Sequence, residues 1–428
     1  MKASSLIEKI RKGGLDLTFS SLYWPDDETI TKQRARYVDA IENFERFFGA
    51  GRDISVYSTP GRVELCGNHT DHNNGVVMAA AVNLDTIAVV SKSEGSEIRL
   101  RSYDFPDEFV VDINKLTPDK DEFGLSQAML RGVVAAFAKR GGSYGAFDMY
   151  AMSDVLIGGG LSSSAAFEVC IATIINEEYN GGRFDGVTLG IISQYAENKF
   201  FGKPCGLMDQ TTCSVGGVIS IDFENPSSPV VESVPLNLSS KGIYLVVTDT
   251  KSDHSDLTDE YAAIRNEMES VAAFFGKNSL REVAYEDFKA GIKDIRNKAG
   301  DRAVVRTIHF FEECRRVRES IEAVRQHDTG RLLELIIECG HSSCEFNQNA
   351  YSVKSPHAQG IPVGLAISQS ILGKRGAWRL QGGGFAGTIQ AFVPEDLLDE
   401  YCKALRGVFG EDACHVLQIR NTGGVKIA

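Results

Sequence analysis

The sequence predicts an α+β protein organised in two lobes. The chain has 428 residues, 43% of them hydrophobic, which is enough apolar material for two packed units of ordinary domain size. The first half mixes runs of β-branched residues with helical patterns, whereas the second half alternates long helices with an extended Gly-rich segment. Residues 224–229, rich in Pro and Ser, separate the two patterns. We therefore expect lobes at residues 1–228 and 229–428.

Hydrophobic periodicity places the elements along the chain. Apolar residues three or four apart predict helices, and β-branched runs bounded by turn residues predict strands. Residues 1–50 read as helical and solvated. Strands are expected at 54–65, 76–90, 97–102, 108–113, 146–152, 215–223 and 243–249, with a further extended segment at 381–393. Helices are expected at 125–140, in the segment that ends near 175, and at 187–200, 256–275, 303–326 and 330–346.

Charge and cysteine content exclude several classes of protein. Lys and Arg total 45 against 58 Asp and Glu, a net charge of −13, so nucleic acid and anionic membranes are poor partners. No apolar stretch approaches the ~18 residues of a spanning helix, and the N-terminus lacks a signal-peptide pattern. The nine cysteines form no CxxC pair, which indicates reduced, mostly buried thiols. We expect a cytoplasmic protein and a monomer, although no pattern bears on assembly.

A glycine- and serine-rich segment leads into one of the predicted helices. It consists of Gly158, Gly159, Gly160, Leu161, Ser162, Ser163 and Ser164. Consecutive glycines let the backbone approach an anion, and the following helix offers free N–H groups and the positive end of its dipole. The segment matches neither the Walker A loop nor the GxGxxG pattern. The hydroxyls can cap the helix or reach a Mg²⁺ held by phosphates. An ordinary turn with serine caps is the alternative.

A second polar cluster lies between the strands at 54–65 and 76–90. Arg62, Asn68, His69, Asp71 and His72 bring a cation, a carboxylate, an amide and two imidazoles into one loop. Such a set suits a polyhydroxylated ligand. A metal site is the rival interpretation, but in an extended loop Asp71 and His72 point to opposite faces. A polar turn with Asx-type hydrogen bonds is the third possibility.

Residues 205–211 carry the third candidate. Asp209 is a lone carboxylate among small and apolar neighbours, which is typical either of a partly desolvated base or of a helix cap. Glu197 lies upstream on the helix predicted at 187–200, where a solvated surface charge is the default interpretation.

Together and in this order, these segments resemble the GHMP small-molecule kinases, and specifically the galactokinase branch. Residues 206–210 are similar to the branch's GIMDQ motif, 158–165 to its GLSSSA loop, and 382–387 to its third, Gly-rich motif. The first segment resembles the signature PGRVNLIGEHTDYN, and the matching residues are Pro60, Gly61, Arg62, Val63, Leu65, Gly67, His69, Thr70, Asp71 and Asn73.

The resemblance implies a ribosomal-S5-like N-terminal lobe, a ferredoxin-like C-terminal lobe and an active site between them. It implies transfer of the ATP γ-phosphoryl group to the anomeric hydroxyl of galactose. Arg62 would stabilise charge near the transferred group, and Asp209 would be the base or orienting carboxylate. The residues implied to bind the sugar are Asn68, His69, Thr70, Asp71, Asp209 and Tyr261. The implied phosphate ligands are Gly158 to Ser164, and Ser164 and Glu197 are the implied Mg²⁺ ligands.

The chain departs from the family signature at four positions. Asn68 stands where the signature has Glu, and His72 stands where it has Tyr. Glu64 stands where the signature has Asn, and Leu156 takes the place of a Pro before the phosphate loop. A carboxylate at C6 of the sugar would be repelled by Glu but tolerated by Asn, and galacturonate kinases of this branch also lack the Glu. The substrate is therefore galactose or, alternatively, galacturonate or another C6- or C2-modified galactose. An Asn that binds the same hydroxyl is the simpler interpretation.

Two further hypotheses belong to other classes. Some galactokinase relatives are catalytically silent sensors of galactose and ATP, but those have a shortened serine loop, whereas Ser162, Ser163 and Ser164 are all present here. Phosphorylation of mevalonate or homoserine is disfavoured, because such acceptors do not need the polar cluster of His69, Thr70 and Asp71.

Overall fold

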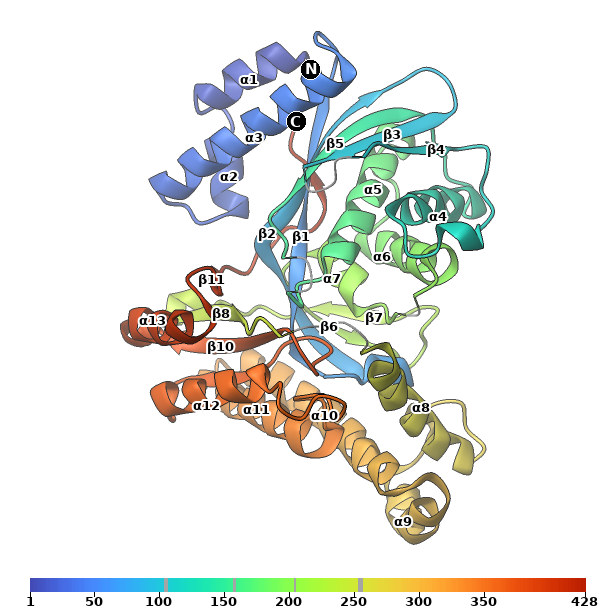
Figure 1. Ribbon diagram of the computed structural model, residues 1–428, viewed down its shortest axis with the longest axis vertical. Coiled ribbons are helices and arrows are strands. Elements are labelled where there is room, and N and C mark those ends of the chain that lie inside the picture. The colour runs from blue at the N-terminus through green and yellow to red at the C-terminus, as the bar shows by residue number, and fades with distance from the viewer. Residues whose placement is uncertain (104–106, 157–158, 204, 253–256) are drawn as a thin grey trace.

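The computed structural model describes residues 1–103, 107–156, 159–203, 205–252 and 257–428, and Figure 1 shows its two sheets with the helices around them. The helices are α1 (Ala3–Arg11), α2 (Asp16–Leu22), α3 (Asp27–Phe48), α4 (Ser126–Lys139), α5 (Ser163–Asn180), α6 (Gly186–Ala196), α7 (Met208–Val215), α8 (Thr258–Phe274), α9 (Tyr285–Ala299), α10 (Asp301–Arg325), α11 (Thr329–Ser342), α12 (Gly360–Leu372) and α13 (Leu398–Phe409). The strands are β1 (Ser55–Cys66), β2 (Val76–Lys92), β3 (Glu97–Ser102), β4 (Phe109–Asp112), β5 (Phe147–Ser153), β6 (Val218–Asp222), β7 (Val230–Ser233), β8 (Ile243–Asp249), β9 (Ala377–Leu380), β10 (Thr388–Pro394), β11 (Cys414–Leu417) and β12 (Val425–Lys426).

The larger sheet has eight strands, and its central strands β1, β2 and β5 are buried on both faces. Its main path runs β12-β1-β2-β5-β3-β4, and β6 and β7 extend it from β2. Successive residues of a strand point to opposite faces. Val56, Val89 and Tyr150 accordingly pack against the N-terminal helices α1–α3, whereas Tyr57 and Val90 pack against α4, α5 and α6. Double burial explains why β2 reads as a nearly continuous apolar run.

The N-terminal helices therefore serve as the cover of one sheet face, a purpose that the sequence alone did not reveal (Figure 1). A buried ionic network fixes them there. Arg36 on α3 donates to the carboxylate of Asp85 on β2 at 2.6 Å, and the hydroxyl of Tyr23 donates to the same carboxylate. Arg420, from the C-terminal end of the chain, lies 3.2 Å from it.

The smaller sheet is antiparallel and four-stranded, in the order β11-β8-β10-β9. One face packs against α12 and α13 through Val246, Ile389 and Leu405. The other face shares a core with α10, α11 and the ends of β1 and β2, to which Leu245, Leu335 and Val63 belong. The two sheets therefore meet through one continuous apolar core. This core holds the end of β1 close to the smaller sheet as well as to its own.

The α+β class with two sheets is confirmed, and the predicted elements up to β6 match those observed. The helix predicted at 187–200 is α6 followed by one π-helical turn, η3 (Glu197–Phe201). Helices α7, α9, α12 and α13 and strands β7, β9, β11 and β12 were not predicted. Both β7 and β12 pair within the larger sheet although they lie beyond residue 228, and the division at 228/229 stays a prediction.

All nine cysteines, each within the described residues, are free thiols, and most are buried as expected. In the parts of the chain that the structure describes, every helix is too short or too polar to cross a bilayer.

Candidate active site

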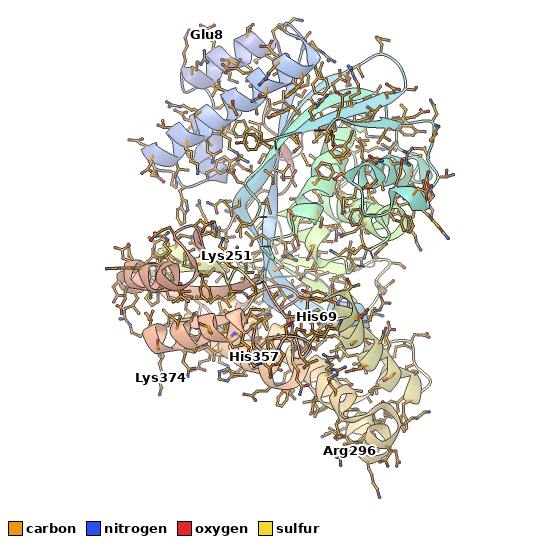
Figure 2. All side chains as sticks on the ribbon, viewed as in Figure 1. Glu8, His69, Lys251, Arg296, His357 and Lys374 are labelled. Atoms are coloured by element: carbon orange, nitrogen blue, oxygen red, sulfur yellow. The ribbon has the colours of Figure 1, made fainter. Side chains whose placement is uncertain are left out.

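The motif segments converge where the larger sheet meets the helices of the second half. Figure 2 shows His69 near the middle of the molecule, beside the start of α8, whereas Glu8, Arg296 and Lys374 lie at its edges. The site is built from the end of β1, the loop after it, the start of α5, residues 205–209 before and within α7, and the Gly-rich segment 381–387. Direct contacts connect all five.

Arg62 and Asp209, predicted as the catalytic pair, form a two-pronged ion pair. The guanidinium donates Nε to Oδ1 at 2.7 Å and Nη2 to Oδ2 at 2.6 Å. Ser162 also donates its hydroxyl to Oδ2. Burial alone would raise the pKa of Asp209, but Arg62 and Ser162 more than offset this effect and hold that pKa below its ordinary value. The carboxylate is therefore ionised at neutral pH.

The glycine- and serine-rich loop is attached to both halves of the molecule. Arg62 donates through its side chain to the Gly160 carbonyl, and Gln381 donates to the same oxygen at 3.0 Å. Thr388 donates to the Gly159 carbonyl at 3.1 Å. Gly160 and Ser162 have positive φ angles of 67° and 58°, which turn the backbone tightly before α5.

Ser163 and Ser164 form the first turn of α5 and are partly buried, and Leu161 is fully buried. Ser162 occupies the N-cap position without a side-chain cap, because its hydroxyl is directed to Asp209. The alternative of an ordinary turn with a serine cap is therefore not observed at this residue. Gly158, predicted as a phosphate ligand, lies outside the described residues.

The loop after β1 folds back on itself through buried polar contacts. Glu313 of α10 accepts from the backbone N–H groups of Gly67 at 3.0 Å and Asn68 at 3.4 Å. Thr70 is fully buried, and its hydroxyl lies 2.8 Å from the Val76 carbonyl. This geometry favours a structural role for Thr70, which holds the loop in shape. It does not favour the substrate contact that the resemblance implied.

Asp71 and His72 are not in an extended segment as expected, because residues 71–73 form a 3-10 turn. The two side chains consequently lie on one side, with His72 Nε2 3.6 Å from Asp71 Oδ1. Among the described residues, even so, His69, Asp71 and His72 do not bring three donor atoms together as a metal site would. Asp71 lies against Gly206, where an added Cβ would be 1.7 Å from its carboxylate. This contact joins the first motif to the segment 206–210, which resembles GIMDQ.

His69 is neutral and has a defined tautomer. Its Nε2 lies 2.9 Å from the Gly383 carbonyl, which can only accept, so Nε2 carries the hydrogen. Nδ1 then accepts from His72 Nε2 at 3.1 Å. Burial, together with His72, lowers the pKa of His69 to about 3. Tyr261 on α8 packs against the same segment and donates its hydroxyl to the Gly384 carbonyl at 3.0 Å.

Asn68 is buried and its amide is fully used. Nδ2 donates to the Gly382 carbonyl at 2.8 Å and to Glu64 at 3.1 Å, and Oδ1 accepts from Asn349 at 2.9 Å. Glu64 in turn pairs with Arg379. The acid and amide of the family signature are thus both present but exchanged between positions 64 and 68. The Asn68 amide therefore has no free hydrogen-bonding group with which to contact C6 of the sugar, and the structure does not support that expectation.

The exchange of acid and amide predicts a compensated double variant. Asn68→Glu places a second carboxylate beside Glu64 with Arg379 as the shared partner, and we expect a loss of about 3 kcal/mol of unfolding free energy. Adding Glu64→Asn restores one acid and one amide, and should recover most of that loss. Urea unfolding of both single variants and the double variant measures the coupling. Additive losses would show that the two side chains do not act as a unit.

A buried acidic group lies behind Asp209. Glu197, predicted as a metal ligand, is 3% exposed and accepts from Gln210 Nε2 at 2.7 Å. Glu168 of α5, which the sequence analysis missed, is fully buried and accepts from the same nitrogen at 3.5 Å. Burial raises the pKa of both carboxyl groups, and the charge of Glu197 adds to the effect on Glu168. The sequence feature that could have indicated Glu168 is its spacing of one helical turn from Ser164.

Comparisons with known proteins agree with this geometry. Residues 42–92 match the family model of the galactokinase galactose-binding signature, and residues 128–217 match that of the GHMP kinase N-terminal domain. The fold is similar to that of Lactococcus lactis galactokinase crystallised with galactose (TM-score 0.77, 21% identity, 90% of this chain and 98% of that one). It is also similar to that of Methanococcus jannaschii mevalonate kinase (TM-score 0.60, 16% identity, 86% and 98%).

The fold and the domain match define a small-molecule kinase of the GHMP superfamily, a class that uses ATP. A galactokinase of Streptomyces coelicolor is 32% identical over 372 residues, which cover 86% of this chain and 92% of the relative. The chain therefore belongs to the galactokinase family.

Proposed function

We propose that the protein transfers the γ-phosphoryl group of ATP to the C1 hydroxyl of galactose. The observation that carries the proposal is the Arg62–Asp209 ion pair, held against Gly160 and Ser162 at the start of α5. An ionised carboxylate and a guanidinium at the end of an anion-binding loop are the parts that phosphoryl transfer needs, since the reaction requires positioning and countercharge more than covalent help.

In this mechanism Asp209 accepts a hydrogen bond from the C1 hydroxyl and orients its oxygen toward the γ-phosphorus. The new P–O bond forms as the bond to the β,γ-bridging oxygen breaks, and ADP leaves. Because Arg62 lowers the pKa of Asp209, the carboxylate is a weak base, and it takes the proton late in the transfer. Arg62 counters the charge on the phosphoryl oxygens. His69 and Asp71 line the sugar side, whereas Asn68 and Thr70 hold the loop in shape.

The residues near α5 fit a magnesium ion, whose preferred ligands are oxygens. Ser164 and Glu197 would hold it, and the buried Glu168 Oε1 and Gln210 Oε1 have no hydrogen-bond partner among the described residues. When bound, the ion supplies positive charge to the phosphate oxygens.

A cytoplasmic location and a monomeric state stay predictions.

The alternative substrate, galacturonate, loses the contact that motivated it, because the Asn68 amide is already satisfied. The test is ADP release with galactose, galacturonate, N-acetylgalactosamine and arabinose, followed by ³¹P NMR of the product. We expect turnover with galactose and a sugar 1-phosphate. Ligand-induced stabilisation without turnover on any sugar would instead favour a silent sensor.

A further inference from the structure

Glu168 is a buried acid to which the family signature assigns no role. It lies one turn after Ser164, and residues four apart share one face of a helix. Its side chain is fully buried, and ionisable groups are almost never buried without a partner. One carboxylate oxygen, Oε1, has no partner among the described residues.

The surroundings of Glu168 are formed by three helical segments. Gln210 of α7 contacts Glu168 and Glu197 through the same amide nitrogen, at 3.5 and 2.7 Å. Glu197 begins the π-helical turn η3, a local feature that is frequent at functional sites. The exposed Lys203 lies beside Glu197, with its Nζ 3.7 Å from Oε1. Two buried carboxylates therefore share one neutral donor.

An independent observation comes from the amide itself. Gln210 is fully buried, and its Oε1 has no partner among the described residues, although its Nε2 is engaged. A buried carbonyl-type oxygen without a donor destabilises the fold. Together with Glu168 Oε1, it adds a second unpaired hard oxygen beside the Glu197 carboxylate. A hard divalent cation, or a water molecule bound to such a cation, would give both unpaired oxygens a partner.

We propose that Glu168 is a further acidic residue of the divalent-cation site, with its free oxygen directed to the cation or to a water molecule bound to it. The inference rests on the proposed function, since the cation is the one that accompanies ATP. Glu168 contributes negative charge beside Glu197, and Gln210 fixes the two carboxylates relative to each other and to the adjacent Asp209.

The test separates metal affinity from nucleotide affinity. We expect Glu168→Gln to bind metal-free AMP-PNP as the wild type does, measured by calorimetry in EDTA. The affinity of the enzyme–AMP-PNP complex for Mn²⁺, measured from the EPR signal of free Mn²⁺, should fall about 10–100-fold. Glu177→Gln, which replaces an exposed acid on the same helix, should change neither value.

Glu168→Leu serves as a second variant that leaves no polar group at the buried position, and it should show the same loss if Glu168→Gln does not fold. An unchanged Mn²⁺ affinity in a folded Glu168 variant would overturn the inference while leaving the kinase proposal intact. A wild-type enzyme that phosphorylates no sugar would instead overturn the proposed function.

Discussion

Asp209→Asn will lower kcat about 10²–10⁴-fold, the range typical of a positioned acid–base group. The amide keeps the shape of the side chain but can neither carry the charge that polarises the C1 hydroxyl nor accept its proton. Arg62 is left without its anionic partner and is free to face the nucleotide phosphates. We therefore expect ATP to bind at least as tightly to the variant as to the wild type, and steady-state kinetics with calorimetric ATP titration measure both effects.

Asp412→Asn is the matched control for this variant. Asp412 is 80% exposed and pairs with Lys251 at the surface, so its replacement should leave kcat unchanged. Comparable turnover in Asp209→Asn and the wild type would remove Asp209 from the reaction. Loss of turnover together with loss of ATP binding would show that the substitution damaged the site as a whole.

Asp85→Asn will destabilise the fold by about 3–5 kcal/mol, because removing one partner of a buried ion pair leaves charge uncompensated. Asp85 is fully buried between Arg36 and Arg420, and Ser58 and Tyr23 also donate to it. Its loss leaves two buried arginines and loosens the N-terminal helices from β2. Urea unfolding measures the change, with Asp53→Asn as control: Asp53 is 71% exposed, and its pair with Lys2 should contribute less than about 1 kcal/mol.

The same residue makes stability depend on pH. Burial alone would raise the pKa of Asp85, but Arg36 and Arg420 hold it below its ordinary value. A carboxyl group whose pKa is lower in the folded state stabilises the fold above its unfolded-state pKa, near 3.9, and this contribution disappears as pH falls through the folded-state pKa. The wild type should therefore lose more stability on acidification than Asp85→Asn does. Parallel acid profiles would contradict the role assigned to Asp85.

The apolar periodicity was sufficient to predict the class of fold, and the resemblance of the motifs to those of the galactokinase branch implied that Arg62 and Asp209 belong to one active site. Both depend on local patterns, since the strand, the glycine loop and the lone acid each have their own signal. Contacts between distant parts of the chain have none. The Glu64–Arg379 pair and the Asn68–Asn349 contact join the first strand to the last quarter of the chain, so the exchange of acid and amide was seen as two separate departures.

Glu168 was missed for a related reason. On a helix a glutamate is ordinarily a solvated charge. Here α7 packs against α5, and its Gln210 contacts Glu168. The strand β12 was missed because two residues carry no pattern, and its position depends on pairing with β1 across the whole chain.

The most direct test of the active-site account is a crystal structure with galactose, AMP-PNP and Mg²⁺. The measurement is the distance from the C1 oxygen of the sugar to the carboxylate of Asp209. A hydrogen-bond distance of about 2.6–3.2 Å, with the γ-phosphate on residues 159–164 facing that oxygen, is the predicted result. A sugar whose C1 oxygen is directed away from Asp209, or another hydroxyl in that place, would contradict the account.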